Sequence, residues 1–182
     1  MGADFIAYTI VLDAGHGGAN PGAIYGGRQE KEDALALTLA VGNILSNSGV
    51  DVVYTRTDDV YETPYMKAQE ANQAGADLFV SIHRNSSQYP ETYSGIESLV
   101  YSDTGLSASA ARNINRGLEE IGFRNIGVTE RPNLIVLNST DMPAVLVEVG
   151  FINSMYDNNL FDSRFNDIAE AIANGILQTI YG

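Results

Sequence analysis

Residues 8–18, YTIVLDAGHGG, contain the stretch that decides the fold of this chain. The β-branched run from Tyr8 to Leu12 predicts a buried strand, and Asp13-Ala14-Gly15 ends that strand in a glycine-rich loop. The loop runs to about Gly27. This unit places His16 directly after the end of a strand.

Strands and helices alternate along the rest of the chain. Apolar spacing predicts helices from Glu30 to near Gly49 and over residues 63–74, 111–121 and 165–182, and short apolar runs predict strands at 52–55, 78–82, 95–101, 133–137 and 144–149. This order implies a largely parallel sheet, in which ligands bind beyond the carboxyl ends of the strands. We therefore predict an α/β fold: a single domain over residues 1–182, with a mostly parallel twisted sheet and helices on both faces.

The composition limits the possible functions of this domain. The 182 residues include no cysteine, which excludes a thiolate metal site and a cysteine nucleophile, so any metal must use histidines and carboxylates. A net charge of -13 disfavours nucleic acid or an anionic membrane as a partner. No apolar run reaches the roughly 18 residues of a membrane span, and residues 1–7 lack a basic stretch followed by an apolar one. If the protein is secreted, we expect its signal to lie outside this chain.

The chain has only two histidines, and each follows a predicted strand: His16 in LDAGHGG and His83 in VSIHRN. Parallel strands bring both to the same edge of the sheet. Either residue could instead be a core histidine bonded to backbone or a histidine on the surface. Their equivalent positions, each beside a loop or helix that carries carboxylates, favour a metal site.

Two glutamates are candidates for the same edge. Glu148 ends the apolar strand AVLVEVGF, where a charged group is costly unless it is paired or linked to a metal. An ion pair with Arg56 or Arg131 is the alternative explanation. Glu30 falls in the first turn of a predicted helix, where the helix dipole alone favours an acidic residue.

Two imidazoles and one carboxylate, with a water in the fourth position, form a known catalytic zinc arrangement. The metal makes the water more acidic, and a second carboxylate can take its proton and deliver it to a leaving amine. The residue types therefore predict one Zn²⁺ held by His16, Glu30 and His83, with Glu148 as the general acid/base.

The glycine-rich loop, DAGHGGANPGAIYGG, has a second possible interpretation as a phosphate-binding loop. It lacks the Lys followed by Ser or Thr of the Walker pattern, and its glycines do not open a helix directly as in the dinucleotide fingerprint. We expect instead that Gly17 and Gly18 keep space beside His16, so that the backbone can pass close to a metal.

Four motifs follow one another along nearly the whole chain: LDAGHGG, the helix-opening pair Glu30-Lys31, ANQAGADLFVSIHRN and MPAVLVEVGFIN. In order and spacing they resemble the zinc-dependent N-acetylmuramoyl-L-alanine amidases of bacterial cell walls. The resemblance implies the same roles for His16, Glu30, His83 and Glu148. It also implies the substrate, peptidoglycan, cut at the amide between the lactyl group of N-acetylmuramic acid and L-alanine.

The resemblance carries further expectations about the site. Asn85, two residues past the second histidine, would lie close to it, and a role in orienting substrate and a role in the loop are both open. Lys67 stands where an arginine is common in the family, Ala34 where an asparagine is, and Asn153-Ser154 in reversed order. None of these is a proposed ligand.

Some members of the family carry an inserted helix before the catalytic glutamate that blocks the site until a partner protein removes it. Residues 84–147 are expected to hold one strand, one helix and one strand, so we predict an open groove and activity without an activator. We also expect a monomer that is secreted or associated with the wall, with wall-binding modules elsewhere in the full-length protein. A zinc peptidase acting within the stem peptide and a catalytically silent wall-binding module are the alternative functions.

Overall fold

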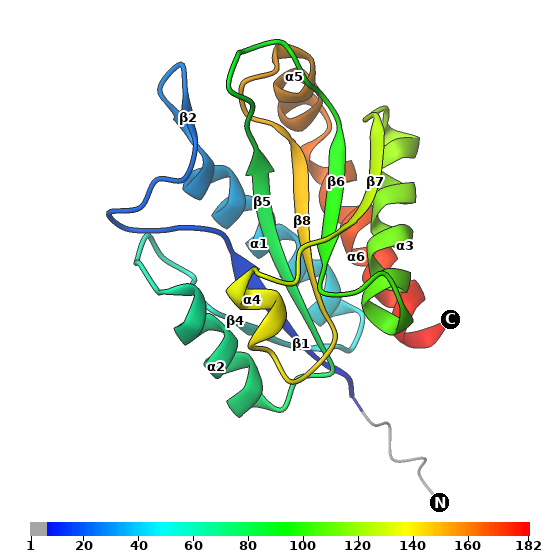
Figure 1. Cartoon of the computed structure of the whole chain (residues 1–182). Helices are drawn as coiled ribbons and strands as arrows, with labels where there is room; N and C mark the ends of the chain where they lie inside the picture. The colour runs from blue at the N-terminus through cyan, green and yellow to red at the C-terminus, as the bar shows by residue number, and fades with distance from the viewer. Residues whose placement is uncertain (1–6) are drawn as a thin grey trace, which may run out of the picture.

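Six strands form one sheet, in the order β4-β1-β5-β8-β6-β7, in a computed structural model that describes residues 7–182 (Figure 1). All neighbouring strands of this sheet are parallel except β6 and β8, which are antiparallel. Residues 1–6, which the predicted domain includes, lie outside the described residues. The strands of the sheet are β1 (Thr9–Ala14), β4 (Asp51–Tyr54), β5 (Leu78–Asn85), β6 (Ile96–Val100), β7 (Asn125–Glu130) and β8 (Ala144–Phe151), and a small hairpin pairs β2 (Ile24–Tyr25) with β3 (Arg28–Gln29).

Helices cover both faces of the sheet. In Figure 1, α1, α3 and α6 lie behind the sheet, whereas α2 and α4 lie in front of its lower half. The helices are α1 (Glu30–Asn47), α2 (Pro64–Ala74), α3 (Gly105–Ile121), α4 (Ile135–Asn138), α5 (Met155–Ser163) and α6 (Phe165–Tyr181). The predicted fold class is confirmed. Within residues 7–182, no helix combines the length and the apolar character needed to cross a membrane.

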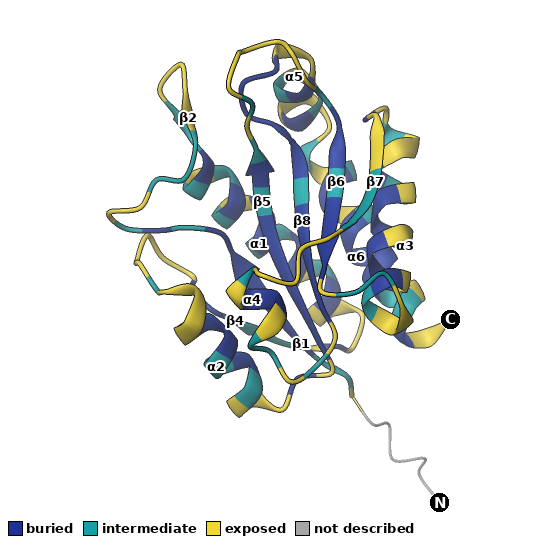
Figure 2. Ribbon diagram, viewed as in Figure 1, coloured by how far each residue is buried: buried dark blue, intermediate teal, exposed yellow. Residues whose placement is uncertain are grey.

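Alternation along the strands divides the core into two clusters of unequal size, and Figure 2 shows how completely the central strands are buried. On β5, Leu78, Val80 and Ile82 belong to the large cluster under α1, α3 and α6, whereas Phe79 belongs to the small cluster under α2 and α4. The small cluster ends where polar residues replace apolar ones on the same face of each strand. These polar residues are Asp13 after Val11 on β1, Ser81 and His83 after Phe79 on β5, and Glu148 after Leu146 on β8.

Helix α5 and the small β2–β3 hairpin were not predicted, and two further segments differ from the sequence prediction. Residues 133–137 were predicted as a strand, but this assignment is wrong, because the chain there turns into the short helix α4. The burial of Val136 and Leu137 agrees with their apolar character, and a short apolar run does not distinguish a strand from a helix. The strand in this part of the chain is β7, which was missed because it lies at the sheet edge and has no fully buried residue.

Candidate active site

His16, Glu30 and His83 meet at the carboxyl ends of β1 and β5, where α1 begins. The His16 Nε2 atom lies 3.0 Å from Glu30 Oε1, and the His83 Nδ1 atom lies 2.8 Å from the same oxygen. One potential ligand atom from each residue lies within 4.8 Å of the others. The structure therefore brings together the three residues predicted to bind metal, in a group that could hold a metal ion.

Glu30 is fixed in this position by both of its carboxylate oxygens. Oε2 accepts a hydrogen bond from the Ala23 N–H, and Oε1 accepts one from the Arg84 N–H. Burial would raise the pKa of Glu30, but hydrogen bonds and charges from the two histidines hold it well below its usual range. The carboxylate is therefore ionised and able to bind a cation.

His16 is held by a partner that the sequence analysis missed. The Asn20 Oδ1 atom lies 3.1 Å from His16 Nδ1 and also accepts a hydrogen bond from the Gly22 N–H, which identifies this atom as the oxygen of the amide. Because an amide oxygen only accepts, Nδ1 carries the proton, and the lone pair of Nε2 faces Glu30 when the ring is neutral. Asn20 thus sets the ring orientation that a metal ligand needs.

The space around the three side chains depends on two glycines. A Cβ atom at Gly15 would lie 2.4 Å from His83 Cε1, and one at Gly22 would lie 2.5 Å from Glu30 Oε2. Gly17 and Gly18, which were predicted to keep space beside His16, face the backbone of Val60 and Tyr61 instead. The prediction for Gly17 and Gly18 is therefore wrong, and Gly15 and Gly22 keep this space instead.

Glu148 lies opposite His83 in the register of β8 and β5. Its Oε2 atom is buried and has no hydrogen-bond partner within residues 7–182. Burial, together with the nearby charges of Glu30 and Glu97, raises the pKa of Glu148 to about 7, although His83 opposes the shift. A carboxyl group with this pKa can both accept and donate a proton near neutral pH.

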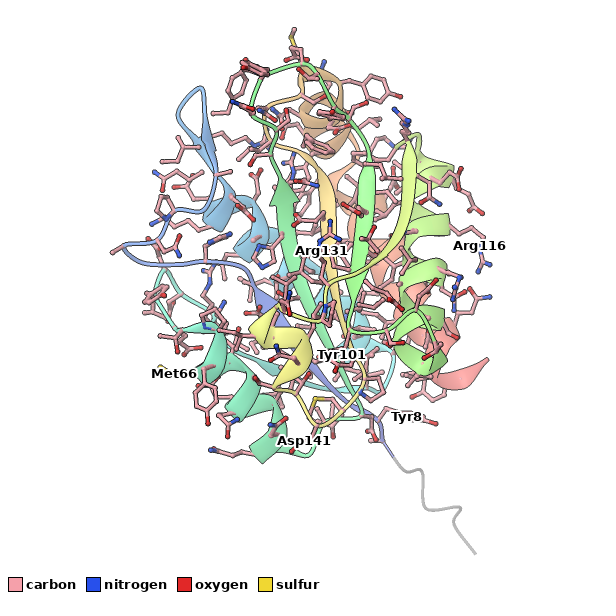
Figure 3. The ribbon with its side chains drawn as sticks, in the orientation of Figure 1. Tyr8, Met66, Tyr101, Arg116, Arg131 and Asp141 are labelled. Atoms are coloured by element: carbon pink, nitrogen blue, oxygen red, sulfur yellow. The ribbon has the colours of Figure 1, made fainter. Side chains whose placement is uncertain are left out.

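The alternative of an ion pair for Glu148 is contradicted within the described residues. The Arg56 guanidinium donates to the backbone carbonyls of Ala14 and Gly15, among others. Arg131, labelled in Figure 3, lies between β7 and α4 and donates to the carbonyl of Glu130. Neither arginine forms a salt bridge with Glu148, so the carboxyl group is left without a cationic side chain.

Asn85 ends β5 two residues beyond His83, after an irregularity in the pairing of β5 with β8. Its Oδ1 atom accepts a hydrogen bond from the N–H of Ser86 at 2.8 Å. This bond gives Asn85 a local role in the loop, and its role in binding substrate stays a prediction.

A buried ion pair supports the loop that carries His16. The Asp13 carboxylate lies 2.6 Å from Lys67 Nζ and accepts hydrogen bonds from Thr55 and Ser81. Lys67 also donates to the carbonyl of Ala14, at the end of β1. Lys67 is therefore the cation that neutralises Asp13, and it ties α2 to the point where β1 enters the loop.

A cavity of about 340 Å³ adjoins the two histidines. The His16 side chain remains 24% exposed and that of His83 16%, so the group can be reached from solvent. Helix α4, which precedes β8, also borders this cavity. The sequence analysis predicted a strand at this position. The lining residues are Asp13, His16, Asn20, Tyr61, Glu62, Pro64, Lys67, His83, Asn133, Leu134, Ile135, Val136 and Leu146.

Comparison with known proteins agrees with this arrangement. Residues 10–178 match the family model described as N-acetylmuramoyl-L-alanine amidase. The chain belongs to this family. It is 37% identical to the sporulation-specific N-acetylmuramoyl-L-alanine amidase of Bacillus subtilis, over 93% of this chain and 67% of that protein. It is also 38% identical to an endolysin of Bacillus phage SPP1, over 94% of this chain and 65% of that protein.

The same relationship holds in three dimensions. An N-acetylmuramoyl-L-alanine amidase of Clostridium difficile 630 superposes with a TM-score of 0.89 at 31% identity, covering 96% of this chain and 97% of that one. The chain spans about two thirds of the length of the two curated relatives above. It thus corresponds to one part of those proteins.

Proposed function

We propose that this chain hydrolyses peptidoglycan at the amide bond between the lactyl group of N-acetylmuramic acid and L-alanine. Membership of the amidase family supports the reaction and the substrate. The observation that carries the proposal is the convergence of two imidazoles and one ionised carboxylate beside a buried carboxyl group that lacks a partner.

The donor set fits zinc. Two nitrogen ligands and one oxygen ligand, with an open position, are the composition of catalytic zinc sites, and the absence of cysteine leaves no thiolate competitor. In this proposal His16, Glu30 and His83 hold one Zn²⁺. When bound, the ion supplies Lewis-acid polarisation of the substrate carbonyl and makes water more acidic.

Glu148 acts as the proton carrier. Its ionised carboxylate takes a proton from the attacking water, and the resulting acid delivers that proton to the nitrogen of L-alanine as the amide bond breaks. Asn20 keeps His16 in the orientation that leaves Nε2 free for the metal. Cleavage of this bond releases the stem peptide from the glycan strand. The enzyme is therefore expected to act at the cell wall.

Two variants separate the proposed roles. Glu148→Gln should retain one zinc per chain and lose at least about 100-fold in hydrolysis, because an amide cannot act as a base. His83→Ala should lose the metal as well as the activity. Metal content by atomic absorption and release of L-alanine termini are the two measurements. Loss of zinc in Glu148→Gln, or full zinc occupancy in His83→Ala, would contradict the assignment.

A further inference from the structure

One carboxylate in the cavity has no part in the proposed chemistry. Glu62 precedes α2 and lines the cavity on the side of Tyr61 and Pro64. Its Oε2 atom is buried and has no hydrogen-bond partner within residues 7–182. The carboxyl group of Glu70 lies within hydrogen-bonding distance of Glu62. The Oε1 atom of Glu62 is not buried in this way, so it is the oxygen that a donor in the cavity can reach, and a cation there would relieve the repulsion between the two carboxylates.

The neighbouring cations are already engaged. Lys67 pairs with Asp13 and donates to the carbonyl of Ala14, and Arg56 donates to backbone carbonyls. Burial and, after it, the charge of the nearby Glu70 raise the pKa of Glu62. Asp13 and Glu62 line the cavity together with Lys67, so the lining has more carboxylates than cationic side chains.

Another part of the cavity lining is apolar. Leu134, Ile135 and Val136 belong to α4 or the residue before it, and Leu146 lies on β8 below Glu148. An aliphatic chain that ends in a cation matches both surfaces, since its methylene groups pack against the apolar wall and its charge meets Glu62.

We infer that Glu62 makes this cavity a subsite for an ammonium group carried by a side chain of the stem peptide. The inference rests on the proposed function, because the cavity begins at His16 and His83, where the scissile amide would lie. The N-acetylated sugars have no cationic group, so the peptide is the part of the substrate that can supply one. Glu62 would therefore select among stem peptides by their side-chain amines.

The test measures binding separately from cleavage. The probe is the tripeptide L-Ala-γ-D-Glu-L-Lys, acetylated at its amino terminus so that the lysine ammonium is its only cation, and the control probe carries an acetyl group on that amine as well. Calorimetry with zinc-loaded wild-type protein should give about tenfold tighter binding of the free amine, a preference that decreases with added salt.

Glu62→Gln should reduce this ratio to about one, because the substitution keeps the size of the side chain and removes its charge. Glu32→Gln, an equal charge change at an exposed position on α1, should leave the ratio at about tenfold. Equal affinity of the wild type for both probes, or a preference that survives Glu62→Gln, would overturn the inference.

The same two peptides joined to N-acetylmuramic acid separate this inference from the proposed function. Cleavage of both with equal kcat/KM contradicts the role of Glu62 and leaves the amidase activity intact. A binding preference without any release of N-acetylmuramic acid supports the ammonium subsite and contradicts the amidase activity.

Discussion

At the scale of single residues, the environment of Glu148 determines what its carboxyl group can do. The group is buried opposite His83 and has no cationic partner, so its pKa lies near 7. Burial alone would lower the pKa of the neighbouring His83 ring, but the hydrogen bond that the ring donates to Glu30 and the nearby negative charges raise it.

The raised pKa of Glu148 predicts a pH dependence of stability. Its folded pKa of about 7 exceeds the ordinary value of 4.5, so the folded state binds more protons, and its contribution to stability is lost as pH rises from 4.5 to 7. In chelator, raising the pH from 5 to 8 should therefore lower the free energy of unfolding of wild type more than that of Glu148→Gln, by roughly 2 to 3 kcal/mol. Urea titrations at the two pH values measure this difference. An equal change in the free energy of unfolding of the two proteins would show that Glu148 has an ordinary pKa.

Asn20 gives a second prediction at this scale. Asn20→Ala removes the acceptor that holds His16 Nδ1, so zinc affinity should fall by about 10- to 100-fold while the fold is kept. Competition with a fluorescent zinc chelator measures the change. Asn159→Ala, at an exposed position on α5, is the matched control and should bind zinc as the wild type does. Unchanged affinity in Asn20→Ala would limit Asn20 to a role in the loop.

Residue types predicted only part of this site. The two histidines and Glu148 stand out because a polar group after an apolar strand needs an explanation. Glu30 was the weakest of the predicted ligands, since the first turn of a helix favours any acidic residue, and the family resemblance strengthened its assignment. Asn20 and Glu62 lie in loops without periodicity, so only the folded chain shows what they face.

At the scale of elements, the junction of β1 and α2 depends on the buried pair of Asp13 and Lys67. Lys67→Met leaves the Asp13 carboxylate buried without its cation and should lower the free energy of unfolding by about 3 to 5 kcal/mol. The double variant with Asp13→Asn should recover part of that loss, because no unpaired charge remains. Chemical denaturation measures both.

The exposed pair of Arg112 and Asp103 provides the control for this prediction. Arg112→Ala should lower the free energy of unfolding by less than about 1 kcal/mol, because solvent screens that pair. A loss in Lys67→Met as small as the loss in Arg112→Ala would mean that the buried pair does not stabilise the junction.

Elements with clear apolar patterns were predictable, whereas α4, α5 and β7 were not. Helix α6 and strand β8 follow from uninterrupted apolar patterns that match their buried faces. Helix α4 has only four residues, and strand β7 lies at the edge of the sheet, so neither has enough buried positions to show a period. Residues of α4 line the cavity. The wrong assignment of α4 as a strand therefore affected the predicted shape of the site more than the predicted fold.

At the scale of the whole molecule, the asymmetry of the two faces creates the site. Three helices cover one face of the sheet over its length, whereas α2 and α4 cover only part of the other (Figure 1). The uncovered part begins where the strands change from apolar to polar residues, and the cavity opens there. The two histidines are thus accessible from solvent without the displacement of any described helix, and activity without an activator stays a prediction.

Digestion of purified peptidoglycan is the most direct test of the central claim. The zinc-loaded chain alone should release stem peptides with new L-alanine amino termini and leave the glycan strands intact, and chelator should abolish this release until zinc is restored. Mass spectrometry of the products identifies the bond that was cut. New termini at another residue of the stem peptide, cleaved glycan strands, or unchanged activity in chelator would contradict the assignment of this chain as a zinc-dependent amidase.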